Sequence, residues 1–226
     1  MGDKTLSLKK FVSEVKPDMH FYHDKRFVIA ILRLALVTLF MIAHQINASD
    51  MKFPDSAGKI VAQDSTYIIR LVETPGCNIK TAEAIFYADG SPSACNAVIC
   101  DFEHYPEFMP NITSARFVSK REENPLYEFC FKAALWTVCY TDILSFDRKN
   151  EDHYIVKCDF IEGDIKDSKG SWDIGRDIAD SSRTRIYYKL YIDTGMFVPR
   201  WVCDILTTKS IPKMIVAIRN RIKRLP

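Results

Sequence analysis

The chain has little glycine, few histidines and no excess of charge of either sign. Its 226 residues include 8 glycines and 5 histidines, and 31 Lys and Arg residues are balanced by 29 Asp and Glu residues. So few glycines, without any internal repeat, argue against repeat architectures and Gly-rich phosphate-binding loops. A formal net charge of +2 excludes a strongly basic chain that wraps nucleic acid, so we predict no nucleic-acid partner.

The common catalytic and metal-binding motifs are also missing. The sequence contains no HExxH, GxSxG or EF-hand pattern, which excludes the best-known zinc-protease, hydrolase and calcium-loop signatures. None of its seven cysteines forms a CxxC pair, and no group of cysteines and histidines has the spacing of zinc ligands. We therefore predict no metal, no cofactor and no catalytic residue set, and we favour a protein that is not an enzyme.

What is present suffices for one globular domain with an appendage. Hydrophobic residues make up 47% of the chain, charged residues 27% and aromatic residues 12%, an ordinary globular composition. From Lys52 onward the composition does not change and no linker-like stretch occurs. We predict an N-terminal export segment at residues 1–48 and a single domain at residues 49–226.

The appendage contains an apolar run at residues 27–43, preceded by Lys25 and Arg26 and followed by the small residue Ala48. A basic flank, an apolar stretch and a small residue near its end are the parts of an export signal. Three interpretations stay open: a cleaved signal peptide, an uncleaved anchor, and a helix of a cytosolic protein. Arg33 opposes a spanning helix, because a charge near the bilayer centre costs about 2.5–3.5 kcal/mol on insertion scales.

Export is the interpretation that we favour. Met19 is an alternative start, and it would shorten the long flank before the apolar run. We predict an exported protein, periplasmic or otherwise extracytoplasmic, that contacts the membrane through residues 27–43 if this segment is not removed.

An odd number of cysteines leaves at least one thiol free or paired between chains. Cys130 and Cys139 would lie opposite each other if residues 134–135 formed the turn of a hairpin. In an oxidising compartment they would then form a disulfide. The alternative is two separate half-buried thiols, because Ala134-Leu135 is poor turn chemistry.

The rest of the chain shows apolar and polar residues alternating with period two, which is typical of antiparallel strands with one apolar face. Such a face must be buried, so we expect the sheet to curl over the last helix. The predicted fold class is α+β, a curved antiparallel sheet wrapped around a long C-terminal helix. The expected elements are a hairpin at 59–72, strands at 79–88, 113–120, 126–135, 136–146, 153–161, 164–175 and 183–192, short helices at 92–101 and 105–109, and a final helix from 198 with a break near Pro212.

Three segments, Cys100–Pro110, Glu162–Trp172 and Val198–Trp201 with Ser210–Met214, resemble signatures of one superfamily. In order, they are similar to the short-helix signature, the "G-D-[FI]…G-x-W" strand pair and the C-terminal helix of the polyketide cyclase/coenzyme Q-binding START-like (SRPBCC, Bet v 1-like) superfamily. The resemblance covers roughly residues 79–226 and implies a helix-grip fold with an apolar cavity under the helix. Relatives bind isoprenoid quinones, sterols, phospholipids or polyketide chains, and they share no catalytic triad.

Aromatic side chains gather on the face of the sheet that we expect to be apolar, where they form either plain core or the wall of a cavity. A wide curved sheet under one helix leaves room for a pocket, and Tyr140 and Tyr188 would offer hydroxyls to a ligand oxygen. The candidate cavity residues are Phe129, Phe131, Trp136, Tyr140, Asp142, Phe146, Trp172, Tyr188, Met214 and Ile218.

Two groups are candidates for acid–base chemistry. Strict alternation puts Asp142 on the apolar side of its strand, where desolvation would raise its pKa; a bulge would instead turn it outward. His104 stands beside Asp101 and Glu103 and is suited to proton transfer, although a solvated, locally capped helix end explains this cluster equally simply.

Three functions follow from this sequence. The first is non-enzymatic binding or transport of a hydrophobic small molecule, such as a lipid or isoprenoid quinone, in a cavity under the C-terminal helix. The second is a polyketide cyclase or aromatase that uses Asp142, His104 or a cavity tyrosine. The third is a protein-binding module like the ribosome-associated toxin relatives, which export argues against.

Overall fold

The computed structural model describes residues 51–55, 57–77, 79–133, 136–195 and 206–225. These residues form nine strands, three short helices, one π-helical turn and a longer C-terminal helix. The strands are β1 Lys59–Gln63, β2 Tyr67–Glu73, β3 Lys80–Asp89, β4 Ile112–Arg121, β5 Asn124–Ala133, β6 Trp136–Asn150, β7 His153–Gly163, β8 Asp167–Arg176 and β9 Arg183–Asp193. The helical elements are α3 Pro92–Ile99, η3 Phe102–His104, α4 Tyr105–Phe108, the π-helical turn η4 Leu206–Ser210 and α6 Ile211–Ile222.

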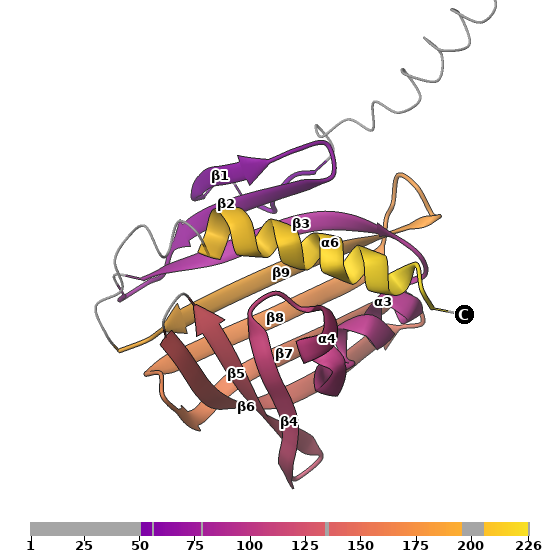
Figure 1. Ribbon diagram of the computed structural model, residues 1–226. Helices are drawn as coiled ribbons and strands as arrows, with labels where there is room; N and C mark the ends of the chain where they lie inside the picture. The colour runs from indigo at the N-terminus through magenta and orange to yellow at the C-terminus, as the bar shows by residue number, and fades with distance from the viewer. Residues whose placement is uncertain (1–50, 56, 78, 134–135, 196–205, 226) are drawn as a thin grey trace, which may run out of the picture. The chain divides into compact units, whose positions relative to one another are not determined.

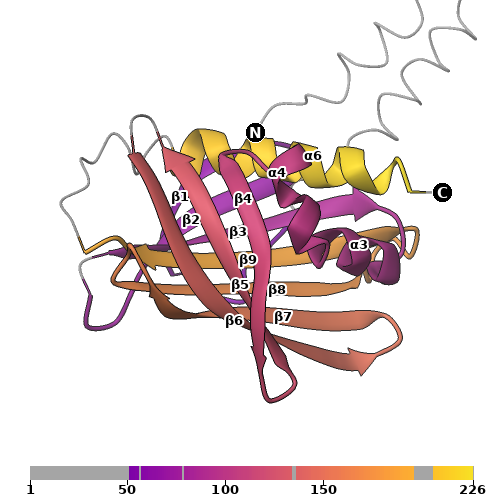
Figure 2. The same cartoon turned by 60° about the horizontal axis from the view of Figure 1, so that its bottom comes forward.

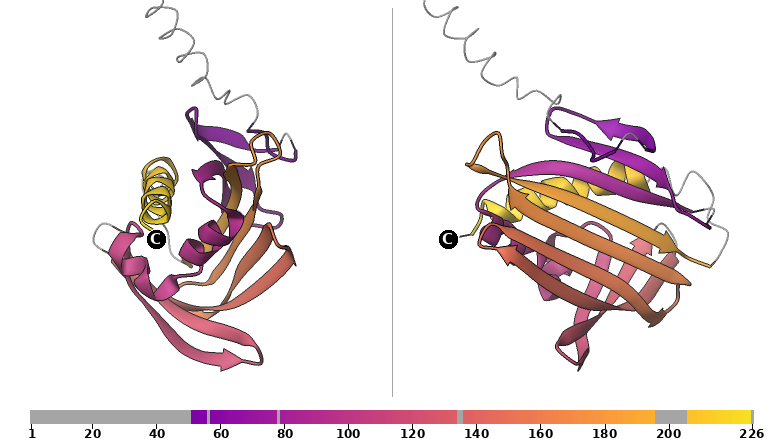
Figure 3. Two further views of the ribbon diagram at one scale, coloured as in Figure 1. Left: turned by 90° about the vertical axis from the view of Figure 1, so that its right-hand side faces the viewer. Right: turned by 180° about the vertical axis from the view of Figure 1, so that it is seen from behind.

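All nine strands belong to one antiparallel sheet with the order β1-β2-β3-β9-β8-β7-β6-β5-β4 (Figure 1). Only β3 and β9 are neighbours that do not follow each other in the sequence, and their pairing joins the N-terminal strands to the β4–β9 meander. Seen along the length of α6, the sheet curves around this helix (Figure 3). The predicted fold class is therefore confirmed.

The concave face of the sheet carries the helices. The short helices α3 and α4 lie on the same side of the sheet as α6 (Figure 2), and α3 contacts β7, β8 and α6. The predicted apolar stripe of α6 is buried, with Ile215 and Ile218 fully inaccessible. Pro212 lies in the first turn of α6, directly after the π-helical turn, so the break expected near Pro212 is the start of a helix, where proline costs no hydrogen bond. The expected helical residues 198–205 lie outside the described residues.

The convex face holds a second, smaller cluster that attaches the start of the domain. Met51 packs there with Ile68, Ile85 and Tyr187. The guanidinium of Arg70, 2% exposed, pairs with Glu83 at 2.6 Å and Asp55 at 2.8 Å and lies 3.9 Å from the ring centroid of Phe53. Buried charges are tolerated when they are paired in this way, so residues 51–55 are fixed against the sheet.

No helix within the described residues has the length and apolarity that crossing a bilayer requires. The predicted export segment at residues 1–48, with its apolar run at 27–43, lies outside the described residues. None of its three interpretations is therefore tested. The described chain therefore leaves the export prediction as it stood.

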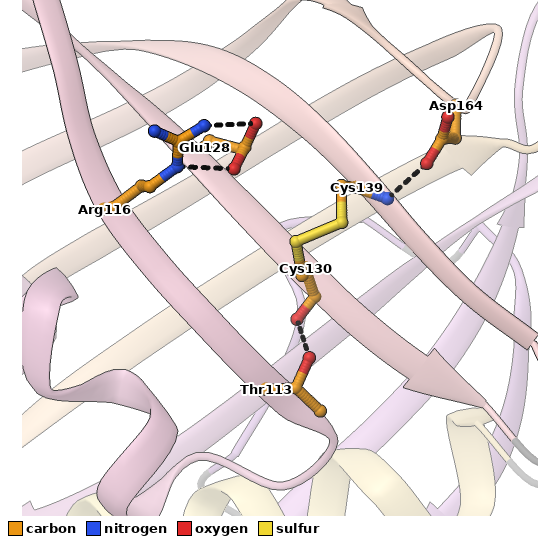
Figure 4. Close-up of a disulfide and its surroundings, with 6 residues drawn as sticks. All are labelled: Thr113, Arg116, Glu128, Cys130, Cys139 and Asp164. Carbon is orange, nitrogen blue, oxygen red and sulfur yellow. Dashed lines mark hydrogen bonds and ion pairs between the residues drawn. A yellow bond between two sulfur atoms is a disulfide. The ribbon is translucent and has the colours of Figure 1, made fainter.

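The β5–β6 pairing has the register that the hairpin hypothesis required. Cys130 pairs with Cys139, and their sulfurs are bonded (Figure 4). The backbone of Cys139 is held on its other side by Asp164, whose carboxylate accepts from the Cys139 N–H at 2.8 Å and whose N–H donates to the Cys139 carbonyl at 2.8 Å. The hydroxyl of Thr113 donates to the Cys130 carbonyl. This disulfide thus joins two strands that β4 and the β7–β8 turn also hold.

We predict that the disulfide contributes about 2–3 kcal/mol to the free energy of unfolding, because it closes a short loop in the unfolded chain. Replacing both cysteines, as Cys130→Ala with Cys139→Ala, should lower the stability by this amount in urea unfolding under non-reducing conditions. Adding a reductant should destabilise the wild-type chain and leave the double variant unchanged. Equal sensitivity of the two proteins to reductant would contradict the prediction.

Candidate functional site

A cavity of about 220 Å³ lies between the concave face of the sheet, the N-terminal half of α6 and the η3–α4 segment. Its walls are mostly apolar. The sheet contributes residues from β3 to β9, and the cover includes Phe102, Tyr105, Met109, Ile211 and Met214. The cavity therefore occupies the position that the resemblance implied.

The cavity takes up only one half of the concave face. Farther along the same strands, that face is filled by Leu144, Val156, Ile174 and Ile186, whose side chains are 0% or 1% exposed and belong to the main core. There α3 and the second half of α6 supply the packing. The empty half and the filled half are thus parts of one apolar face that differ in what covers them.

Small residues in the floor leave this space open. Gly170 of β8 lines the cavity, and a Cβ atom at this position would lie 3.4 Å from Cβ of Cys158 and 3.9 Å from Cδ1 of Leu190, both ordinary contacts. Ala82 of β3 is the other small residue of the lining. A glycine inside a strand commonly marks a place where another group approaches closely, and at Gly170 that place is the cavity.

Gly163 has a different role in the same segment. It ends β7 with a φ of +140°, and a Cβ atom there would lie 2.4 Å from Cα of Tyr140. Only glycine fits so close to the neighbouring strand. In the Glu162–Trp172 signature, Gly163 therefore allows the close approach of β7 to β6, and Gly170 forms part of the cavity floor.

Aromatic rings form much of the wall. The rings of Trp172 and Tyr188 lie 4.1 Å apart, and those of Phe129 and Tyr140 are separated by 6.3 Å. Phe102 of η3, 3% exposed, closes the wall by packing on Phe129 at 6.0 Å. Such tilted and edge-on pairs stabilise the wall beyond simple area burial.

Asp142 is the one carboxylic acid among the lining residues that the structure describes. Its side chain is 5% exposed, and its Oδ1 accepts a hydrogen bond of 2.8 Å from the hydroxyl of Ser168. A register shift does occur here: Thr141 pairs with Glu162 and Asp142 with Phe160. The extra residue, Ile161, belongs to the partner strand β7, so Asp142 keeps its place on the concave face. The alternative in which a bulge turns Asp142 outward is therefore wrong.

Burial dominates the protonation of this site. It raises the pKa of Asp142 to about 6, against the lowering effect of the Ser168 hydrogen bond and with a further increase from the nearby Asp159 and Asp167 carboxylates. Burial also raises the pKa values of Tyr140, Tyr188 and Cys158, to which the charge of Asp142 adds. At neutral pH these three groups are protonated, and Asp142 is the group that titrates.

Seven of the ten predicted cavity residues line the cavity; whether they bind a ligand stays a prediction. Two lie elsewhere: Phe146 is 49% exposed and packs on the far side of Phe102, and Ile218 is fully buried in the filled half of the core. The side chain of Trp136 lies outside the described residues. The seven lining residues are Phe129, Phe131, Tyr140, Asp142, Trp172, Tyr188 and Met214.

Sequence reasoning missed the short-helix cover and part of the floor. Tyr105 is not among the predicted cavity residues, but it lines the cavity, and its hydroxyl donates to the carbonyl of Ile99 at 2.5 Å. Cys158 and Gly170 also line the cavity without having been predicted to do so. Their position on the same face as Trp172 was the available signal.

The His104 cluster lies outside the cavity. The Nδ1 atom of His104 is 2.5 Å from Asp101, and this hydrogen bond raises the pKa of the exposed imidazole. Arg221 completes the cluster at 3.4 Å from Asp101 and 3.3 Å from Glu107. Asp101 makes no side-chain cap to η3, so the cluster is a surface ion-pair network rather than a cap. Among the described residues no group of three potential ligands gathers to hold a metal.

We predict that Asp142 makes the protein less stable as the pH rises. Its folded pKa of about 6 exceeds the ordinary value of 3.8, so the folded state favours the protonated form and loses about 2.5 kcal/mol relative to the unfolded state between pH 4 and pH 7.5. The Asp142→Asn variant should lack this loss. In urea unfolding, the stability of the variant relative to wild type should therefore rise by about 2.5 kcal/mol over this pH range, and a constant difference would refute the assignment.

Comparison with solved structures shows the same fold in proteins of low sequence identity. The human StAR-related lipid transfer protein 5 superposes with a TM-score of 0.66 at 11% identity, over 87% of this chain and 98% of that one. A STAR-related lipid transfer protein fragment from Xanthomonas axonopodis gives 0.63 at 11% identity, over 75% and 100%. A START superfamily protein from Mycobacterium smegmatis gives 0.55 at 14% identity, over 65% and 99%.

No curated protein matches the sequence significantly. The model of the family described as polyketide cyclase/dehydrase and lipid transport does match, over residues 91–219. This range runs from the cap of α3 into α6, more than half of the chain, and it contains nearly all of the cavity. The resemblance drawn from the three sequence segments is confirmed: the chain belongs to the polyketide cyclase/dehydrase and lipid transport family.

Proposed function

We propose that the chain binds and carries a hydrophobic small molecule, without changing it, in the cavity under α6. The observation that carries this proposal is an apolar cavity of about 220 Å³ with a single buried carboxyl group in its wall. Concave, mostly apolar pockets with a few placed polar groups are the usual form of small-molecule sites. Membership of a family described by lipid transport supports the same function.

The size of the cavity limits the ligand. Sites for drug-sized molecules usually measure about 300–1,000 Å³, so 220 Å³ suits a compact molecule or one end of a single apolar chain. A lipid with two long chains is too large for this volume. We therefore place a compact molecule, or one end of a single apolar chain, in the cavity. Its apolar part would lie against the rings of Trp172 and Tyr188 and the side chain of Met214.

Polar groups are available to orient such a ligand. The hydroxyls of Tyr140 and Tyr188 have no hydrogen-bond partner within the described part of the chain. A ligand oxygen can accept a hydrogen bond from either hydroxyl. The second oxygen of the Asp142 carboxyl is likewise free to contact a ligand, because Ser168 occupies only Oδ1.

A second candidate function is proton transfer to the bound molecule, as in a cyclase. It is favoured by the pKa of about 6 at Asp142, since a general base works best when its pKa lies near the operating pH. The Asp142→Asn variant separates the two functions. Turnover of a polyketide-like substrate that disappears in this variant, while binding persists, would assign the enzyme; binding without turnover in wild type assigns the carrier.

We also propose that the protein works outside the cytoplasm. The apolar run at 27–43 with its basic flank supports this, as does the bonded pair Cys130–Cys139, because disulfides persist mainly in oxidising compartments. Fractionation of expressing cells should recover the chain in the exported or membrane fraction with this disulfide formed. Recovery in the cytosol with both thiols free would refute the proposal.

We predict that Gly170→Val blocks ligand binding, because the added side chain enters the cavity. The affinity of the full chain for 1-octanol, measured by isothermal titration calorimetry, should fall by at least about tenfold, or about 1.4 kcal/mol. Gly175→Val is the matched control: Gly175 is also in β8 with an ordinary φ, and a Cβ there meets only His153 and Asp152.

The control should bind 1-octanol like wild type. Both variants contain residues 27–43, so binding of the alcohol to that apolar segment cancels in the comparison. Equal affinities of all three proteins, or no measurable binding to wild type, would overturn the proposed site.

A further inference from the structure

The charges around the cavity are unevenly distributed. The described lining residues include the carboxyl group of Asp142 and no lysine, arginine or histidine. Nor does Asp142 have a cation as partner: its hydrogen bond comes from the neutral hydroxyl of Ser168. The buried Arg70 forms ion pairs with Glu83 and Asp55 on the convex face. Arg221 forms ion pairs with Asp101 and Glu107 on the surface.

The other titratable groups that face Asp142 are neutral over the physiological range. Four of them line the cavity: Tyr140 from its own strand, Cys158 from β7, Tyr188 from β9 and Tyr105 from α4. The fifth is Tyr127 of β5, which pairs directly with Asp142 across the strands. Burial raises the pKa of each of the five. The carboxylates of Asp159 and Asp167 act on Asp142 from outside the lining and also oppose a further negative charge.

A ligand's polar group would therefore meet one acid and several neutral donors. A hydroxyl suits this setting, because it can donate to the free Asp142 oxygen and accept from a tyrosine hydroxyl. Within the described lining an anionic head group has no cation to pair with, and it faces the charge of Asp142 in a low-dielectric cavity. The repulsion is relieved only when Asp142 is protonated, and at pH 7.5 a carboxyl group with a pKa of about 6 is protonated in about one molecule in thirty. The charge of Asp142 therefore lowers the affinity for an anion roughly thirtyfold, and the unpaired desolvation of the anion lowers it further.

We propose that Asp142 selects ligands by the charge of their polar group: the cavity takes neutral, hydroxyl-bearing hydrophobic molecules and rejects carboxylates and other anionic amphiphiles of the same length. This inference rests on the proposed binding function and adds the chemical class of the ligand. Asp142 acts here as a specificity-determining residue through direct contact with the ligand's polar group. A purely structural role for Asp142 would change stability without changing the ratio of the two affinities.

The test compares 1-decanol with decanoate at pH 7.5, two probes with the same ten-carbon chain and different head groups. Titration calorimetry on the full wild-type chain should give at least about a hundredfold tighter binding of the alcohol. In Asp142→Asn, which keeps the size of the side chain and removes its charge, decanoate should bind at least about tenfold more tightly than in wild type. The ratio of the two affinities should fall accordingly.

Asp147→Asn is the matched control, because it also exchanges a carboxylate for an amide in β6, but at an exposed position outside the lining, and its carboxylate is not among those that act on Asp142. It should leave the ratio close to that of wild type. A second measurement does not depend on folding of the Asn variant. Decyl sulfate stays an anion at both pH values, and its affinity for wild type should rise at least about tenfold from pH 7.5 to pH 5, as Asp142 becomes protonated.

The outcomes separate this inference from the proposed function. If neither 1-decanol nor decanoate binds wild type, the proposed function falls. If 1-decanol binds but decanoate binds equally well, or if Asp142→Asn leaves the ratio unchanged, the carrier function stands and the selection by charge is overturned. A ratio that changes equally in Asp147→Asn would also overturn it, because the effect would then be one of overall charge.

Discussion

A wide curved sheet has more apolar surface on its concave face than one helix covers, and the rest of this structure follows from that constraint. The helix α6 has twelve residues, about 18 Å at 1.5 Å per residue, and it lies across a sheet of nine strands. Where α3 assists it, the face is closed by a solid core. Where α6 and the η3–α4 segment are the described elements that cover it, and the floor residues are as small as Gly170, space remains. The cavity is thus a consequence of incomplete coverage.

The buried charged groups on the two faces of the sheet differ in their partners. On the convex face Arg70 is paired with Glu83 and Asp55, and its hydrogen bond lowers the pKa of Asp55. On the concave face Asp142 has only the Ser168 hydroxyl, and burial raises its pKa to about 6. An unpaired buried carboxyl reduces stability at neutral pH, and a hydrophobic residue of similar size would avoid this cost. Perturbed groups of this kind gather at functional sites, which is why the cavity and not the convex cluster is the candidate site.

The sequence could predict which face of each strand is apolar, because side chains alternate with period two. For the β5–β6 register it offered two alternatives, and the one with a turn at 134–135, which places Cys130 opposite Cys139, is the one that the structure has. It could not predict how far along a strand the cavity extends, because alternation has no information on what covers each position. Phe146 alternates with the same face of β6 as Asp142, but it is half exposed and contacts Phe102 instead of lining the cavity. Ile218 lies on the buried side of α6, in the solid core. Gly170 is not among the predicted cavity residues, because these were chosen for their large aromatic and apolar side chains. A cavity depends equally on small residues, which leave volume unfilled.

The disulfide and the cavity are physically related through the β5–β6 wall. Cys130 stands between Phe129 and Phe131, and Cys139 precedes Tyr140, so the bonded sulfurs lie on the opposite face of the strands that line the empty half. Where they line the cavity, these strands lack the solid inward packing found farther along the sheet, where Leu144, Val156 and Ile174 are buried. A crosslink on the outer face, together with the backbone hydrogen bonds of Asp164, holds the wall without filling the space behind it. The β5–β6 wall is thus stabilised from the face opposite the cavity.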